Sequence, residues 1–333
     1  MKNLSIQGLR GYLMIWIVLF HYTSRYPALY PSANIDFPVR FENGGEVGIV
    51  VFFIISGFFL AKGLLGLEAS NTKLLEFCKH KYLRLWIPYV ISIILIFIGV
   101  KIFGLAGREC TFKTFLIDVF FIYHPMVGYV DLAHWFIAHL IFVQCFLGVV
   151  FYKVKKCNRG KLFKTLIVFF NLLFIISVMP QTASHELQVV DTFIPFKSTL
   201  AVLLGIGIYL YKRDKNMVDM MFVVFTVCSL TMLLSQILIC AYTVLFYLLL
   251  SSENKILKPI FQNKMIVEIG NMSFYWYLIH QNIGYILLNR INTKSGGATS
   301  EYWVLLVCMI TFFMGYIVKF LETFLVNKIN GSK

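Results

Sequence analysis

Arg10 and His21 are the residues whose types and spacing point most directly to chemistry. Both lie in the first apolar segment, IQGLRGYLMIWIVLFHY. Eleven residues of α-helix complete three turns plus about 20°, so both side chains project from one face, roughly 16 Å apart along the axis. Ionisable groups are costly in hydrocarbon and mark functional sites by default. A histidine at membrane depth is also a natural proton acceptor, so we predict a functional site here.

The composition is that of a membrane protein. Of the 333 residues 59% are hydrophobic and 14% are charged, with a mean hydropathy of +0.77, which is too apolar for a water-soluble domain of this size. Segments of about 20 apolar residues predict membrane-spanning helices. Ten segments qualify: 6–23, 45–66, 86–105, 132–152, 163–179, 196–211, 217–233, 235–251, 266–289 and 302–326. We therefore predict an all-α, polytopic membrane protein of ten helices, with residues 1–333 as a single domain because the loops are short.

The basic charge follows the predicted topology. The net charge is +14, and most Lys and Arg residues fall at the two termini and in the loops on the same side of the membrane. This distribution places both termini in the cytoplasm and accounts for the charge without a nucleic-acid partner. The seven cysteines are odd in number and widely spaced, so they predict neither a disulfide framework nor a zinc site. We expect no metal ion.

Lys81 and Arg84 are the candidate anion-binding residues. They are three residues apart in KHKYLRLWIPY, so they share a helix face at the predicted cytoplasmic boundary. Such a pair suits the phosphates of an acyl carrier nucleotide. The alternative is that both belong to the general excess of cytoplasmic positive charge and contact only lipid headgroups.

Glu46, His134 and His280 are polar groups on three other predicted helices. Each on its own could be structural, because a lone intramembrane histidine often makes only an interhelical hydrogen bond. Together with His21, all map to the outer half of the membrane, whereas Arg10 and the Lys81 and Arg84 pair map to the inner half. This sorting by depth predicts a donor site inside and an acceptor site, or catalytic support for His21, outside.

Two further features leave alternatives open. The small residues Gly48, Ser56 and Gly57 either let another helix pack closely or leave a narrow channel for a substrate arm. The aromatic-rich segment 107–131 lies outside in the predicted topology, where it either lies at the membrane interface or re-enters the membrane.

Four blocks of the chain resemble the membrane-bound acyltransferase family 3, the polytopic O-acyltransferases of bacterial cell-surface carbohydrates. LRGYLMIWIVLFHY is similar to the family's N-terminal arginine, ten residues, histidine motif. GIVVFFIISGFFL, KHKYLRLWIPY and IGNMSFYWYLIHQ are similar to its second-helix, basic and late histidine blocks. The resemblance implies that His21 is the essential histidine, that Arg10 is its essential partner, and that Lys81 to Arg84 form part of an acyl-CoA site.

The chain departs from the family pattern at two places. Lys81 stands where the basic block commonly has an arginine, which weakens a bidentate phosphate contact. The middle of the chain reads HWFIAHLIFVQ, without the carboxylate that many members carry there. If that glutamate assists catalysis in relatives, its role is missing here or has moved, for example to Glu46.

The expected function is the transfer of an acyl group, most simply acetyl, from cytoplasmic acyl-CoA to a hydroxyl of a cell-surface or lipid-linked carbohydrate. His21 is the expected general base, although a transiently acylated His21 stays open. We expect a multi-pass protein of the bacterial plasma membrane whose partners are lipid, acyl-CoA and the carbohydrate, with no bound cofactor. The alternatives are a transporter or flippase of lipid-linked sugars, and a polysaccharide polymerase or ligase.

Overall fold

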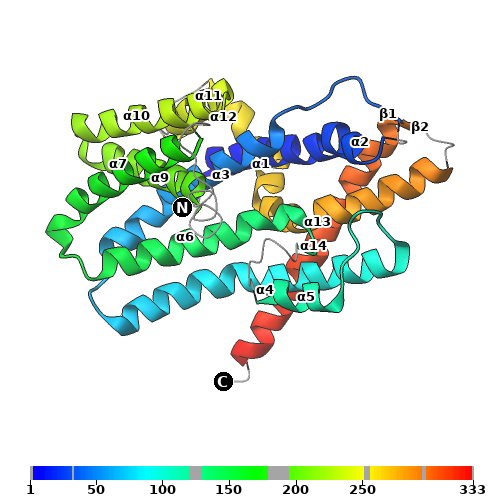
Figure 1. Cartoon of the computed structure of the whole chain (residues 1–333), viewed down its shortest axis with the longest axis horizontal. Helices are drawn as coiled ribbons and strands as arrows, with labels where there is room; N and C mark the ends of the chain where they lie inside the picture. The colour runs from blue at the N-terminus through cyan, green and yellow to red at the C-terminus, as the bar shows by residue number, and fades with distance from the viewer. Residues whose placement is uncertain are drawn as a thin grey trace. The chain divides into compact units, whose positions relative to one another are not determined.

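Long apolar helices make up most of the computed structural model, which describes residues 3–31, 34–120, 129–178, 195–250, 256–294 and 298–331 (Figure 1). Within these described ranges, six helical segments are long and apolar enough to cross a membrane. They are Leu4–Leu29, Gly44–Gly66, Asn71–Phe103, Leu132–Tyr152, Lys156–Ser177 and Glu301–Lys328. The prediction of a helical, multi-pass membrane protein is confirmed at this level.

Four predicted segments lie in helices outside this group of six. α9 (Phe196–Asp214) and α13 (Lys264–Lys294) are long enough but more polar. α10 (Met217–Leu233) and α11 (Ile237–Leu249) are apolar but have only 17 and 13 residues. Each of the ten predicted segments therefore overlaps a helix, with residues 179 and 251 outside the described residues. The number of crossings and the cytoplasmic location of both termini stay predictions.

The described chain forms two compact units, and the division passes through α3 (Gly44–Gly66), α4 (Asn71–Phe103) and α6 (Trp135–Tyr152). Unit 1 comprises Met1–Gly48, Arg84–Phe136 and Asn254–Lys333, and unit 2 comprises Ile49–Leu83 and Ile137–Glu253. Of the predicted site residues, all except Lys81 belong to unit 1. The single domain over residues 1–333 stays a prediction.

α13 is the central helix of unit 1. It packs along α1 (Leu4–Phe20) and along α14 (Glu301–Gly331), and α12 (Leu257–Phe261) also packs on α1 (Figure 1). After α1 the chain continues as the π-helix η1 (His21–Arg25) and the short α2 (Tyr26–Leu29). Two three-residue strands, β1 (Asn34–Asp36) and β2 (Ala298–Ser300), pair in parallel. The strand pair ties the segment after α2 to the segment before α14.

Glycines let α1 meet α12 and α13 backbone to backbone. A Cβ built on Gly8 would overlap the carbonyl of Phe261, and one built on Gly11 would overlap the carbonyl oxygen of Ile266. From the other side, a Cβ on Gly270 would overlap the carbonyl oxygen of Gln7. Small residues serve helix association in this way because helices in lipid gain from close van der Waals packing.

α5 (Phe112–Val119) lies in the segment that we expected at the interface or re-entering the membrane. Phe112, Leu116 and Phe120 are exposed on one face, whereas Thr114 and Asp118 are buried on the other. An apolar face turned outward on a short helix favours a position at the lipid interface. Residues 121–128 of the segment lie outside the described residues.

Unit 2 shows what the small residues of the second predicted helix do. A Cβ on Gly57 of α3 would overlap the carbonyl oxygen of Val202 on α9, and one on Gly205 would overlap the carbonyl oxygen of Ile54. The two helices therefore touch through reciprocal glycines. This contact favours the packing role of Gly57 over a narrow channel at that position.

Arg159, at the start of α7 (Arg159–Val178), caps the C-terminal end of α3 from within unit 2. Its buried guanidinium donates to the carbonyl oxygens of Leu64, Leu65 and Leu67 at 3.1, 2.6 and 2.5 Å and to that of Val154 at 3.1 Å. The last carbonyls of a helix lack intrahelical partners, and a cation there also complements the helix dipole. Arg159 therefore stabilises the end of α3, in addition to contributing to the predicted excess of cytoplasmic positive charge.

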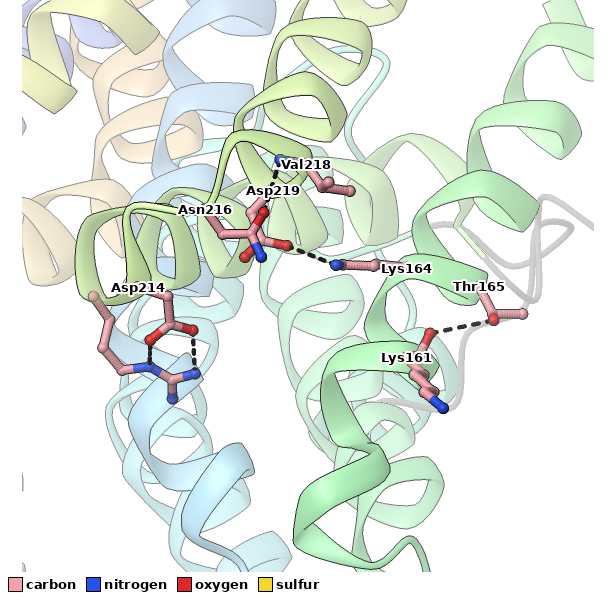
Figure 2. Close-up of polar contacts among 8 residues, drawn as sticks. Lys161, Lys164, Thr165, Asp214, Asn216, Val218 and Asp219 are labelled. Atoms are coloured by element: carbon pink, nitrogen blue, oxygen red, sulfur yellow. Dashed lines mark hydrogen bonds and ion pairs between the residues drawn. The ribbon is translucent and has the colours of Figure 1, made fainter.

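A tight turn joins α9 to α10. Lys215 takes the left-handed conformation, with φ of 53°, and Asn216 caps α10 by accepting from the backbone N–H of Val218 at 2.8 Å. Figure 2 shows this cap beside the ion pair between Lys164 of α7 and Asp219 of α10, whose nitrogen and oxygen lie 3.4 Å apart. The ion pair links the ends of α7 and α10 within unit 2.

The glycine contact between α1 and α13 predicts a selective loss of stability. Gly270→Ala should destabilise unit 1 by about 1–3 kcal/mol or prevent folding, because the new methyl group meets backbone that cannot rotate away. Thermal unfolding in detergent measures the effect. Gly160→Ala is the matched control, since nothing lies within 4 Å of a Cβ at Gly160. Equal melting temperatures for the two variants would contradict the proposed contact.

Candidate active site

His21 lies where α1 changes into the π-helix η1. The α-helix is regular through Phe20, so the eleven-residue spacing keeps Arg10 and His21 on one face. A π-helical turn inside an α-helix is frequent at functional sites. Here it reorients the residues that follow His21, and the imidazole itself is buried.

Tyr22 fixes this turn on α13. Its hydroxyl donates to the carbonyl oxygen of His280 at 2.7 Å and also lies 3.2 Å from the hydroxyl of Thr311 on α14. The Tyr22 ring lies against Gly284, where a Cβ would overlap it. Because Tyr22 is adjacent to His21, this anchoring also sets the position of the His21 imidazole.

The polar surroundings of His21 come from α13. Nδ1 of His21 lies 3.1 Å from the hydroxyl oxygen of Tyr285 and 3.3 Å from Nε2 of Gln281. The His21 ring meets the ring of His280 edge-on, with centroids 4.9 Å apart. In the part of the chain that the structure describes, Nε2 of His21 has no hydrogen-bond partner, so this nitrogen is the one available to a reacting group.

His280 and His134 are each held by a backbone carbonyl. Nδ1 of His280 lies 2.7 Å from the carbonyl oxygen of Tyr277, and Nε2 of His134 lies 2.8 Å from that of Leu278. A carbonyl only accepts, so these nitrogens carry the protons. Within the described residues, Nε2 of His280 and Nδ1 of His134 are buried without a partner. The ring contact brings together His21 and His280, which were predicted only to share the outer half of the membrane, and His134 contacts α13 at Leu278.

The segment before α6 locks onto the middle of α13. Asp131 caps the 3₁₀-helix η2 (Leu132–His134): one carboxylate oxygen accepts from the backbone N–H of Ala133 at 2.9 Å, and the other accepts from that of Asn282 at 3.0 Å. The N–H of Ala133 also donates to Oε1 of Gln281 at 2.8 Å. The Asn282 side chain donates to the carbonyl of Val130 at 2.7 Å. These bonds hold Gln281, and through it the environment of His21.

Asp118 supports this segment from α5. Its buried carboxylate accepts from the backbone N–H of Val130 at 2.5 Å. The pKa of Asp118 is raised to about 7, mainly by burial; the Val130 hydrogen bond lowers it and the negative charge of Asp131 raises it. The carboxyl is therefore half protonated near neutral pH.

Arg10 and Arg84 approach each other from α1 and α4. Arg10 is half-buried and donates to Oε1 of Gln7 at 3.2 Å, and the positive charge of Arg84 lies near enough to act on it. Arg84 is exposed. Lys81 lies one turn earlier on α4, 5.5 Å from the centre of the Phe77 ring. The sequence predicted that Arg84 and Lys81 share a helix face. In the structure, Arg84 also lies near Arg10 within unit 1.

Glu46 lies in the first turn of α3 and is half-buried. The two residues before it, Gly44 and Gly45, lie against Trp16 and Phe20 at the end of α1. The start of α3 therefore packs beside the turn that carries His21. The role of Glu46 at an acceptor site stays a prediction.

Sequence reasoning missed Gln281 and Tyr285. The signal for Gln281 was present, because it follows His280 directly in LIHQNIG, and an amide inside an apolar helix is unusual. Tyr285 had no comparable signal among the many aromatic residues. As a whole the site can accept, donate or relay a proton. Among the described residues, no three His, Cys, Asp or Glu side chains are grouped so that they could hold a metal ion.

Asp118 predicts a pH-dependent stability. Between the ordinary carboxyl pKa of 3.8 and about 7, the folded protein holds a proton that the unfolded chain has lost, so stability falls as pH rises through this range. Asp118→Asn does not ionise and still offers Val130 an acceptor. We expect the melting temperature of the wild type to fall from pH 5 to pH 7, and to fall less in the variant. The same fall in both proteins would contradict this account.

The comparison with known families agrees with the geometry. The family model described as "Acyltransferase domain" (Acyl_transf_3) matches residues 3–320, which is nearly the whole chain. No match is found among curated proteins or among solved structures. The matched region includes His21, Arg10, Arg84 and all of the α13 residues that surround His21. The chain therefore belongs to the membrane acyltransferase family 3.

Proposed function

We propose that the protein transfers an acyl group, most simply acetyl, from cytoplasmic acyl-CoA to a hydroxyl of a cell-surface or lipid-linked carbohydrate. In this proposal it lies in a bacterial plasma membrane with both termini in the cytoplasm. Family membership supports acyl transfer. The observation that carries the proposal further is the His21 imidazole, buried and held at Nδ1, with Nε2 unpartnered among the described residues.

The donor end is assigned to Arg10 and Arg84. Two guanidinium groups near enough to repel one another, one of them half-buried, form an arrangement that a bound anion would stabilise. The phosphates of CoA supply that anion, while Lys81, which belongs to unit 2, stays a predicted CoA-binding residue. The thin pantetheine arm then carries the thioester along the face of α1 that Arg10 and His21 share.

The reaction needs one proton transfer in each direction. His21 removes the proton from the carbohydrate hydroxyl as its oxygen attacks the thioester carbonyl. The new C–O bond forms, the C–S bond breaks, and the proton on His21 passes to the departing CoA thiolate. The products are the O-acyl carbohydrate and CoA, and His21 returns to its neutral state.

Two histidines support this imidazole. His280 and His134 are buried and oriented by backbone carbonyls. We therefore assign them a structural role around His21, without direct contact with the sugar. Glu46 lies at the start of α3, close to the end of α1, and is the candidate for binding the acceptor hydroxyls.

The first test is the transfer of radiolabelled acetyl from acetyl-CoA to a panel of purified surface glycans in membranes. His21→Ala should lower the rate by about 100-fold or more, since general base catalysis contributes that much. Arg84→Gln should raise the KM for acetyl-CoA about tenfold with little change in kcat. Lys101→Ala, an exposed cation in the last turn of the same helix, is the matched control.

Two results would contradict the proposal. Label transfer that persists in His21→Ala would remove the assigned role of His21. An unchanged KM in Arg84→Gln would remove the assigned donor site. Label that remains on the wild-type protein after denaturation, and is absent from His21→Ala, would show that His21 is acylated and is not acting as a base alone.

A further inference from the structure

We propose that Gln281 is a positioning residue that holds the resting His21 imidazole in the tautomer with its proton on Nε2. The inference rests on the proposed function only for its relevance to catalysis. Its evidence is the hydrogen-bond geometry around Nδ1 of His21.

The orientation of the Gln281 amide is fixed by the backbone. Oε1 of Gln281 accepts from the N–H of Ala133 at 2.8 Å, so its other terminal atom, Nε2, is the NH₂ group, which can only donate. That nitrogen lies 3.3 Å from Nδ1 of His21 and 3.5 Å from the hydroxyl oxygen of Tyr285. Its two hydrogens therefore serve these two acceptors.

Tyr285 points to the same tautomer. Its hydroxyl oxygen lies 3.1 Å from Nδ1 of His21 and accepts from Gln281, so within the described residues Nδ1 is the acceptor for the phenolic proton. Nδ1 thus faces two donors and must present its lone pair. A neutral imidazole carries one proton, which then resides on Nε2.

The opposite tautomer is possible for Tyr285 but not for Gln281. A hydroxyl can accept a hydrogen bond from an Nδ1–H by rotating its own hydrogen away, whereas an amide held at its oxygen by Ala133 still directs an N–H at Nδ1. Gln281 is therefore the residue that opposes the form with a free lone pair on Nε2. The base form carries its proton on Nδ1: Nε2 releases one proton to water, Nδ1 takes one up, the Tyr285 hydroxyl then accepts a hydrogen bond from Nδ1, and the Gln281 contact loosens.

Nitrogen-15 NMR of histidine-labelled protein in detergent tests this directly, because chemical shifts distinguish the two tautomers. The His21 signals are those missing from His21→Gln. We expect the wild type to show the Nε2–H form in an excess of about tenfold or more, as expected where the other form loses a buried hydrogen bond. Gln281→Met, similar in size but without a donor, should shift the ratio toward the Nδ1–H form.

Two matched variants separate the contributions. Tyr285→Phe should retain the Nε2–H form, because Gln281 still donates and no acceptor for an Nδ1 proton remains. Gln262→Glu changes another glutamine of unit 1, which donates to Ser5 at 2.8 Å, and should leave the His21 spectrum unchanged.

The proposal is overturned if the wild type shows the Nδ1–H form, or if a folded Gln281→Met keeps the wild-type ratio. If Gln281→Met does not fold, loss of the Nε2–H form in Tyr285→Phe overturns it instead, and its retention supports it. None of these readings needs acyl transfer, so they are independent of whether the proposed function holds.

Discussion

The active region of unit 1 depends on the hydrogen bonds that lock the segment Val130–His134 onto α13. The backbone N–H of Asn282 donates to Asp131. One helical turn earlier, the backbone carbonyl of Leu278 accepts from His134. Buried polar groups are stable only when paired, so the two elements hold each other in register. Gln281 lies between these two contacts, which is why its amide has one orientation. The geometry at His21 follows from that orientation.

Close helix packing does the rest of the positioning. α1 meets α12 at Gly8 and meets α13 at Gly11 and Gly270, and Tyr22 packs on Gly284 of α13 where the π-helix begins. In lipid, helix association relies on such contacts and on interhelical hydrogen bonds more than on burial of apolar surface. As a result, one helix supplies nearly the whole polar environment of a histidine that another helix carries.

The fold class and part of the site could be predicted from sequence because membrane solvation imposes strong rules. Apolar runs had to be helices, and Arg10 and His21 stood out as costly groups in such a run. Proximity across helices could not be predicted: depth sorting suggested that His21 and His280 share a layer, but their ring contact depends on where α1 and α13 cross. Gly270 and Gly284, which set that crossing, look like any other glycines in sequence. The role of Arg159 was hidden for a similar reason, since a cap on α3 by the start of α7 is a tertiary contact.

The central proposal is that an acyl group passes from a CoA on one side of the membrane to a hydroxyl that enters from the other side, with His21 as the base. The most direct measurement uses oriented proteoliposomes, with membrane-impermeant labelled acetyl-CoA and the glycan acceptor supplied on chosen sides, and with orientation determined by protease access to the termini. The account predicts transfer only when acetyl-CoA is on the side of the termini and the glycan is on the opposite side, and no transfer with His21→Ala. Transfer with acetyl-CoA on the side opposite the termini, or equal transfer by the His21→Ala protein, would contradict it.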